Sequence, residues 1–245
     1  MVTEEHSGSA PPRRERPGLP PIGEKVIERV LPEGATWVEA FDDPAEATLF
    51  PEEEAAIARA VDKRRREFTT VRHCARRAMA ELGVPPAPLL PGERGAPQWP
   101  AGVVGSMTHC AGYRAAVVGP AGTVVTIGID AEPHEPLPGG VLDAVSLPEE
   151  RARLRELSTQ DGKVHWDRVL FSCKESVYKA WFPLTGAWLD FEQADLTFDA
   201  AGGTFHARLL KPGGQAEGRP LTEFTGRWLA ADGFVVSAIV RLRER

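Results

Sequence analysis

The sequence predicts an α+β fold built from two similar halves, residues 22–125 and 126–245. Three observations support this prediction. The chain of 245 residues is 42% hydrophobic, which is enough to bury a sizeable core. Helical patterns precede short β-branched runs, and this order occurs twice along the chain. The order recurs although no residue-level repeat is visible between the halves.

The first half begins after a segment rich in Pro, Ser, Gly and Arg, and we expect residues 1–21 to form a disordered tail. Apolar residues at helical spacing cover 51–82, and Gly83 with the prolines that follow ends the run. Because the run is long, we expect two helices with a break near 63–66. A Pro- and Gly-rich loop follows at 83–100. Two strands of this half are expected at 103–107 and 115–118. A third, at 124–129, crosses the border into the second half.

The second half opens with a Pro- and Gly-rich stretch at 133–148, which we interpret as a linker or an active-site loop. Pro148 suits the first turn of a helix over 148–157. A second helix is predicted over 164–182, ending at Pro183. A Gly-rich loop is expected at 211–219. The expected strands are 194–198, 203–210, 225–231 and 234–241.

Composition excludes several classes of protein. The net charge of −6 disfavours binding of nucleic acid. The longest apolar runs, such as residues 234–240, are far shorter than the ~20 residues that span a bilayer. No apolar segment follows the basic N-terminal stretch, so a secretory signal is not predicted. Three cysteines without a C-x-x-C pair (Cys74, Cys110 and Cys173) favour reduced thiols and a cytoplasmic protein.

Two carboxylates stand where an apolar strand ends, Asp130 and Glu132. In an extended chain, residues two apart share one face, so both side chains could reach one cation. The alternative interpretation is an ordinary polar strand end.

The expected helix over 164–182 carries a second cluster of charges. Glu175 and Lys179 are four residues apart, which also suits an ordinary surface ion pair. Bulky apolar residues flank this stripe, so partial burial is favoured. Glu175 could then be a third carboxylate beside the first two, with Lys174 and Lys179 facing an anion. Three acidic oxygen ligands without a Cys/His set favour Mg²⁺ over Zn²⁺.

Two further segments could bind phosphate. Thr108 and His109 follow a strand and could donate hydrogen bonds, although a turn histidine without a role is an equal alternative. The segment is not G-x-S-x-G, so a nucleophile elbow is excluded. On the basic helix, Arg65, Arg72 and Arg76 share a face, and arginine suits phosphate recognition. A solvated charged face is the alternative. Motifs of P-loop, dinucleotide-binding and H-E-x-x-H type are absent.

Taken in order, these segments resemble a 4′-phosphopantetheinyl transferase of the monomeric, surfactin-synthetase-activating type, close to its actinobacterial branch. The resemblance covers about residues 40–240. The motifs that carry it are VRHCAR at 71–76, GERGAP at 92–97, GSMTHC at 105–110, GIDAE at 128–132 and FSCKESVYKAW at 171–181. Each motif alone is weak, but G-I-D-x-E followed by K-E-x-x-x-K is highly specific.

The resemblance implies a pseudo-dimer of two α+β halves with the active site in the cleft between them. It implies that coenzyme A donates its phosphopantetheine arm to a serine of an acyl, peptidyl or aryl carrier protein, releasing adenosine 3′,5′-bisphosphate. Such a protein is a holo-[acyl-carrier-protein] synthase. The implied Mg²⁺ ligands, for which Mn²⁺ is an alternative metal, are Asp130, Glu132 and Glu175.

The resemblance also assigns the coenzyme A contacts. The residues implied to bind its phosphates are Arg64, Arg72, Thr108 and His109, with Lys174 and Lys179 on the phosphoryl groups. The family often has a lysine in the loop before the T-H motif, and Arg94 is the nearest basic residue here. The serine hydroxyl needs a base, for which Glu175 is the candidate. Whether Glu175 is base, metal ligand or both stays open.

Two other functions remain alternatives, namely another Mg²⁺-dependent phosphoryl-transfer enzyme and a non-catalytic module that binds coenzyme A or a carrier protein. The pathway served, whether fatty-acid, polyketide, nonribosomal-peptide or siderophore synthesis, is open. The apolar stretch 183–191, with Trp188, could dock the carrier or belong to the core. The two-half architecture makes a monomer sufficient.

Overall fold

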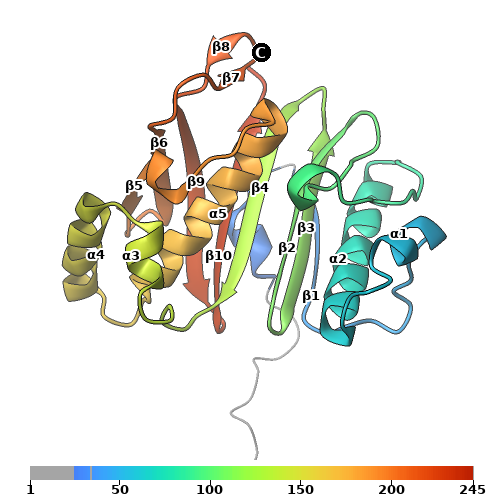
Figure 1. Cartoon of the computed structure of the whole chain (residues 1–245), viewed down its shortest axis with the longest axis horizontal. Helices are drawn as coiled ribbons and strands as arrows, with labels where there is room; N and C mark the ends of the chain where they lie inside the picture. The colour runs from blue at the N-terminus through green and yellow to red at the C-terminus, as the bar shows by residue number, and fades with distance from the viewer. Residues whose placement is uncertain (1–24, 34, 245) are drawn as a thin grey trace, which may run out of the picture.

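A computed structural model describes residues 25–33 and 35–244. The predicted tail, residues 1–21, lies outside the described residues. Long helices pack on antiparallel sheets, which confirms the predicted α+β class (Figure 1). Within the described ranges, no helix is both long and apolar enough to cross a membrane.

The elements up to residue 120 form one layer of helix on a three-stranded sheet. They are η1 (Ile27–Val30), β1 (Thr36–Ala40), α1 (Pro51–Ala56), α2 (Asp62–Glu81), η2 (Glu93–Gly95), β2 (Val103–Cys110) and β3 (Tyr113–Pro120). The strand order is β1-β3-β2, and both pairs are antiparallel. Helix α2 packs on β1 and β3, where Ala75, Ala78 and Met79 are fully buried.

The remaining elements repeat this arrangement on a larger scale. They are β4 (Val124–Pro133), α3 (Val141–Val145), α4 (Pro148–Gln160), α5 (Trp166–Thr185), η3 (Phe191–Gln193), β5 (Ala194–Asp199), β6 (Thr204–Leu209), β7 (Gln215–Ala216), β8 (Arg219–Pro220), β9 (Glu223–Ala231) and β10 (Phe234–Leu242). The order of the large sheet is β4-β10-β9-β6-β5. Helix α5 lies across its face (Figure 1).

The two sheets follow the same path. In each, the first strand is followed by the helices and then by a meander whose last strand returns to pair with the first. The pair is β1 with β3 in the small sheet and β4 with β10 in the large one. Strands β2 and β4 lie next to each other where the sheets meet (Figure 1).

The helix break of the first half lies earlier than predicted. Helix α1 ends at Ala56 and α2 begins at Asp62, so 63–66 are helical. The predicted break near 63–66 was wrong because Arg65 reaches back to α1, donating to Ile57 O at 3.0 Å and pairing with Glu54. The arginine run therefore belongs to the first turns of α2, where it stabilises the joint with α1.

Other boundaries also differ. Helix α5 continues through Pro183 to Thr185 and ends where Gly186 adopts a left-handed conformation (φ 62°), a common helix terminus. The stretch 133–148 is not all loop, because it contains α3. Each expected strand of both halves is present with shifted ends. Short elements without a periodic pattern, such as β1 and η1, were not predicted.

Gly128 explains how closely α5 approaches β4. A Cβ atom at this position would lie 2.1 Å from Ser176 O and 2.7 Å from Ala180 N, closer than any side chain tolerates. The absence of a side chain allows the helix backbone to rest on the strand. This contact brings the charged face of α5 over the acidic end of β4.

A residue-level repeat does exist, although none was visible in the sequence alone. Helices α1 and α4 both begin with an apolar cap followed by Pro-Glu-Glu, and the second glutamate is fully buried in each, Glu53 and Glu150. Each accepts the N–H of its own cap residue, Phe50 at 2.9 Å and Leu147 at 2.7 Å. Both halves thus start their helices with the same buried carboxylate, because the same N–H groups need an acceptor.

Candidate active site at the junction of the two sheets

Side chains of β2 join the two sheets. Ser106 Oγ accepts the N–H of Ile129 at 3.1 Å, and Thr108 Oγ1 accepts the N–H of Ala131 at 2.9 Å. All four groups are buried. The two bonds pair backbone donors of β4 with hydroxyls of β2, so the segment with the T-H motif lies beside the acidic end of β4.

Asp130 is the centre of this junction. Its side chain is 6% exposed, and Oδ1 accepts from Lys179 Nζ at 2.7 Å and from Thr108 Oγ1 at 3.4 Å. The same ammonium group donates to Ile129 O at 3.1 Å. The other oxygen, Oδ2, is buried and has no hydrogen-bond partner within the described part of the chain. A buried carboxylate oxygen without a donor is costly, which is typical of a site built for a ligand.

The two other predicted carboxylates carry raised pKa values. Burial and the charge of Asp130 raise the pKa of Glu132 to about 7, against the lowering effect of Arg168, which donates to Glu132 Oε2 at 2.9 Å. Burial raises the pKa of Glu175, with Lys179 opposing the shift and Asp130 adding to it. Each shift reports chiefly burial of a carboxylate, with the charge of Asp130 adding to it.

The donor chemistry of these carboxylates fits a hard cation such as Mg²⁺. The unpartnered Oδ2 of Asp130 and the raised pKa values of Glu132 and Glu175 are the observations that support this fit. A ready-made site is not formed, however, since no group of three His, Cys, Asp or Glu residues among 25–33 and 35–244 is arranged around one point. Lys179 and Arg168 instead supply the positive charge.

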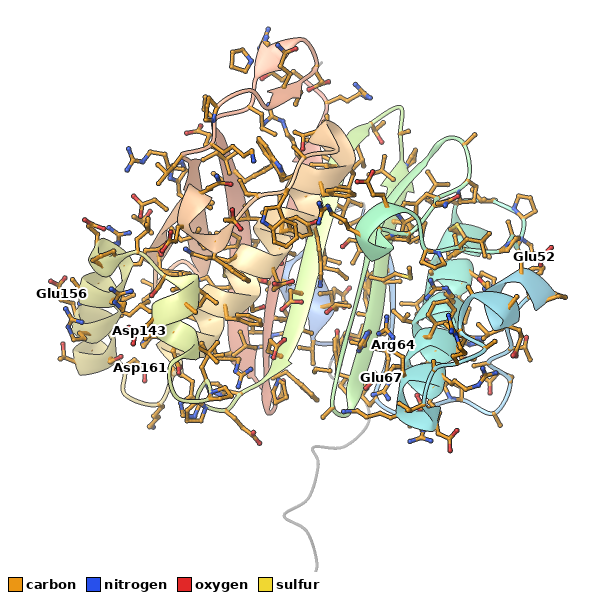
Figure 2. The ribbon with its side chains drawn as sticks, in the orientation of Figure 1. Glu52, Arg64, Glu67, Asp143, Glu156 and Asp161 are labelled. Atoms are coloured by element: carbon orange, nitrogen blue, oxygen red, sulfur yellow. The ribbon has the colours of Figure 1, made fainter. Side chains whose placement is uncertain are left out.

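His109 lies at the end of β2, between α2 and this centre. Arg64 NH1 lies 2.6 Å from its Nε2, and Glu67 Oε2 lies 3.5 Å from its Nδ1. Figure 2 shows Arg64 and Glu67 on the side of α2 that faces β2 and β3. Burial lowers the pKa of His109 to about 4, with the carboxylate of Glu67 opposing the shift and the nearby cations adding to it. The imidazole is therefore neutral at pH 7.

The other arginines of α2 do not share this position. Arg72 is buried, donates from Nε to Leu89 O at 2.8 Å and lies over the ring of Phe68. Burial lowers the pKa of Arg72 to about 10. Arg76 pairs with Glu53 at 2.9 Å. The face predicted for phosphate recognition is therefore mostly occupied by contacts with α1 and with the loop after α2.

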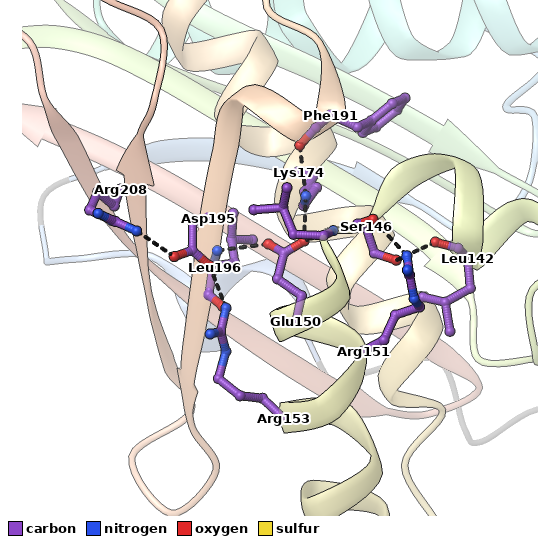
Figure 3. Close-up of polar contacts among 11 residues, drawn as sticks. Leu142, Ser146, Glu150, Arg151, Arg153, Lys174, Phe191, Asp195, Leu196 and Arg208 are labelled. Atoms are coloured by element: carbon purple, nitrogen blue, oxygen red, sulfur yellow. Dashed lines mark hydrogen bonds and ion pairs between the residues drawn. The ribbon is translucent and has the colours of Figure 1, made fainter.

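Lys174 also lies away from the group, and its predicted contact with an anion needs correction. Its side chain is 1% exposed, and the ammonium group donates to Glu150 Oε2 and to Phe191 O, both at 2.7 Å (Figure 3). Lys179 is five residues later, so it projects from a different side of α5. Only Lys179 reaches Asp130.

Arg94 reaches the second half from the loop between α2 and β2. It adopts a left-handed backbone conformation (φ 53°), and its guanidinium lies 5.0 Å from the ring centroid of Trp188. Trp188 is 44% exposed and packs against Tyr178. A cavity of about 170 Å³ is lined by Trp188, Tyr178 and Glu175 among others. The loop that carries Arg94 therefore borders the same region as Glu175.

Two residues of the site were missed in the sequence. Arg168 lies seven residues before Glu175 and eleven before Lys179, so helical spacing places all three on one face of α5. Glu67 follows Arg64 at i,i+3 on α2. The helical spacing was visible in the sequence in both cases. It identifies these residues as part of the site only once the structure shows that these helix faces meet β4 and β2.

Comparison with known proteins agrees with the geometry. Residues 52–119 match the family model described as the 4′-phosphopantetheinyl transferase N-terminal domain, and residues 126–228 match that of the 4′-phosphopantetheinyl transferase superfamily. The chain is 58% identical over 218 residues to the 4′-phosphopantetheinyl transferase Svp of Streptomyces mobaraensis, covering 87% of this chain and 88% of that protein.

Two other relatives are similar over nearly their whole length. The 4′-phosphopantetheinyl transferase PptT of Mycobacterium tuberculosis is 54% identical over 223 residues, covering 88% of this chain and 97% of that protein. The 4′-phosphopantetheinyl transferase Npt of Nocardia iowensis is 54% identical over 222 residues, covering 87% of this chain and 99% of that protein.

Proposed function

Because the chain belongs to the 4′-phosphopantetheinyl transferase superfamily, we propose that it transfers the 4′-phosphopantetheine arm of coenzyme A to a serine of an apo carrier protein. The observation that carries the proposal is the junction of β2, β4 and α5. There a buried carboxylate with an unpartnered oxygen, Asp130, lies beside the lysine Lys179 and close to the basic and imidazole groups of the first half.

The phosphates of coenzyme A are the natural ligands of the cationic side of this junction. Arg64 and His109 would bind the phosphate of the nucleotide, while Lys179 and Thr108 would face the pyrophosphate. Charged donors are suited to phosphate oxygens because each bond is charge-assisted. Arg72 contributes indirectly, since its bond to Leu89 O fixes the loop that leads to Arg94.

Asp130, Glu132 and Glu175 would hold Mg²⁺, or Mn²⁺ in its place. When bound, the metal neutralises the pyrophosphate and stabilises the charge of the departing adenosine 3′,5′-bisphosphate. Arg168 binds one oxygen of Glu132 and two backbone carbonyls, of Glu135 and Pro136, so it fixes the carboxylate and the loop after β4 as one unit. The acidic end of β4 is thereby pre-arranged.

Glu175 is the candidate that accepts the proton of the carrier's serine. Burial raises its pKa, and a carboxylate with a raised pKa is a stronger base. Its side chain makes no hydrogen bond to other described residues, so it is available to a substrate hydroxyl. A role as metal ligand competes for the same oxygens.

The carrier would approach from the side of Trp188, whose exposed ring and neighbour Arg94 offer both apolar and cationic contact.

All groups of the site come from one chain, which is consistent with action as a monomer. The predicted halves, 22–125 and 126–245, stay part of the proposal, with their border moved to the turn before Val124, where β4 begins. The three cysteines are free, which is compatible with a cytoplasmic location.

The decisive experiment mixes the protein with coenzyme A, Mg²⁺ and an apo carrier protein, and measures the mass of the carrier. The expected result is a gain equal to one phosphopantetheine group on the serine, dependent on metal. Carriers from fatty-acid, polyketide, nonribosomal-peptide and siderophore synthesis, compared by kcat/KM, would identify the physiological class. Tight binding of coenzyme A without turnover on any carrier would contradict the proposal and favour a non-catalytic binding module.

A further inference from the structure

A polar chain of three residues connects α2 to the end of β2. Arg64 NH1 contacts His109 Nε2 at 2.6 Å, and Glu67 Oε2 lies 3.5 Å from Nδ1. A guanidinium group has donors only, so Nε2 must be the acceptor. The single proton of the neutral imidazole is then on Nδ1, directed at Glu67. Both ring nitrogens are engaged, and neither presents a proton to a ligand.

Binding of a phosphate at His109 requires this arrangement to change. A phosphate oxygen is an acceptor, so Nε2 must carry a proton to bind it. Two forms of the ring meet this requirement. One is the imidazolium, which keeps the proton on Nδ1. The other is the second neutral tautomer, in which the lone pair of Nδ1 would point at the carboxylate of Glu67.

Glu67 decides between the two forms. Its side chain is 10% exposed, and among the described residues its one ion pair besides His109 is with Lys63 Nζ at 3.9 Å, so its negative charge is weakly compensated. A lone pair facing this carboxylate is repelled, whereas an N–H is attracted. The imidazolium is therefore the form that satisfies Glu67 and the phosphate together.

We propose that binding of coenzyme A is coupled to uptake of a proton by His109, and that Glu67 is the positioning residue that imposes this coupling. The inference rests on the proposed function. The proton comes from solvent and is bound at Nε2, the bond from Arg64 to Nε2 is broken, and Arg64 becomes free to bind the same phosphate. No covalent bond to coenzyme A changes in this step.

Burial of the ring, reinforced by nearby cations, explains why the proton is absent beforehand. Arg64 on α2, Lys179 on α5 and Arg114 on β3 all disfavour the imidazolium, and only Glu67 favours it. A phosphate dianion shifts this balance toward the imidazolium, because a nearby opposite charge raises a histidine pKa by about 1–3 units. The ligand thus supplies the counter-charge that the free site lacks.

Isothermal titration calorimetry tests the coupling. Coenzyme A is titrated into the full chain at pH 7 in buffers of different ionisation enthalpy, none of them phosphate. The slope of binding enthalpy against ionisation enthalpy reports the protons taken up. A phosphomonoester is mostly dianionic at this pH, since its second pKa is about 6, so its own titration contributes little. We expect uptake of up to about half a proton per coenzyme A for the wild type at this pH, because a rise of about 1–3 units from a pKa of about 4 reaches at most about 7.

Glu67→Gln is the informative variant. The amide of glutamine can donate to Nδ1, so the neutral tautomer with a proton on Nε2 is then allowed, and we expect binding with little proton uptake. Glu54→Gln is the matched control, because Glu54 is an exposed partner of Arg65 on the neighbouring helix, and it should keep the wild-type slope. Glu132, whose pKa is about 7, is the same in all three proteins, so the difference between them isolates His109.

The outcomes are distinct. Wild-type binding without proton uptake, or equal uptake by wild type and Glu67→Gln, would overturn the coupling and leave the proposed function standing. Absence of coenzyme A binding by the folded wild type would instead contradict the proposed function. If Glu67→Gln does not fold, His109→Gln replaces it, and persistence of the wild-type slope in that variant would equally reject the inference.

Discussion

The buried glutamates of the two halves, Glu53 and Glu150, have the same surroundings but different counter-charges. Each closes the first turn of its helix, and each also accepts a backbone N–H from beyond the long helix, that of Leu89 or of Leu196, at 2.8 Å. Glu53 faces two arginines of α2, at 2.9 and 3.8 Å. Glu150 faces the single lysine Lys174 of α5 at 2.7 Å (Figure 3).

The comparison shows which parts of the two halves are equivalent and which have diverged. Arg72 and Lys174 are equivalent, since each is the buried cation of the long helix next to the buried glutamate. One and five residues later, α5 carries Glu175 and Lys179 at the junction with β4. The same positions on α2 are His73 and Arg77, which lie away from the junction. The buried ion pair is therefore shared, while the carboxylate and the lysine that meet the end of β4 come from α5, and α2 contributes Arg64 and Glu67 beside His109 instead.

Asp130→Ala should show most clearly that the junction serves activity, whereas the buried ion pair common to both halves serves stability. We expect transfer to fall by about a thousandfold or more, because the central carboxylate for the metal is removed, while the unfolding midpoint stays near that of the wild type. The mass of the carrier and urea unfolding measure the two effects. Near-normal turnover by folded Asp130→Ala would show that Asp130 is not the centre of the site.

Lys174→Met should have the opposite profile, with a large effect on stability. It leaves the buried carboxylate of Glu150 without a cation, which typically costs about 3–5 kcal/mol of unfolding free energy. Arg76→Met should cost less, about 1–3 kcal/mol, because Arg72 remains near Glu53. The double variant Lys174→Met with Glu150→Leu should not recover the loss, because it leaves the N–H groups of Leu147 and Leu196 without their acceptor. Equal losses from the two single variants in urea unfolding would refute the distinction between one and two cations.

His109→Ala tests the contribution of the first half to binding. Loss of a charged hydrogen bond to phosphate is worth about 1.5–3 kcal/mol, so KM for coenzyme A should rise by about tenfold or more. Dephospho-coenzyme A should be less affected if His109 meets the 3′-phosphate. Steady-state kinetics with both donors measure this. The same rise for the two donors would place His109 at another phosphate.

Trp188→Ala should change recognition of the carrier and little else. The ring is 44% exposed, so we expect a several-fold rise in KM for the carrier, with coenzyme A binding unchanged and Tm within about 4 °C of the wild type. Trp181→Ala, seven residues earlier and 1% exposed, is the control, and emptying that site should cost about 3–5 kcal/mol. If Trp188→Ala melts as low as Trp181→Ala, the residue serves packing rather than docking.

The last effect concerns the dependence of stability on pH. The pKa of Glu132 is about 7 in the folded protein and near 4.5 when unfolded, so the folded state binds this proton more tightly. Its contribution to stability is therefore complete below about pH 4.5 and is lost as the pH rises through about 7. In metal-free protein, Glu132→Gln should flatten the decline of the unfolding free energy over this interval. An unchanged slope would show that the carboxylate is solvated in the folded state.

Much of the site was predictable because it depends on local spacing. Asp130 and Glu132 share a strand face, and Glu175 and Lys179 share a helix face, whatever these elements pack against. The α+β order and most helix and strand positions follow from the same periodicities. The break between α1 and α2 was misplaced because a contact between helices, that of Arg65 with Ile57 O, determines it.

The sequence by itself determined which side chains point the same way along each helix or strand, since backbone geometry sets that direction within a few residues. Only the tertiary structure decided which opposite charges meet. Lys174 and Lys179 look equivalent in the sequence, yet one is buried against Glu150 and the other binds Asp130. The physical reason is that an ion pair depends on elements distant in sequence, here α4 and β4, which contact α5 at different places and whose packing no local pattern specifies.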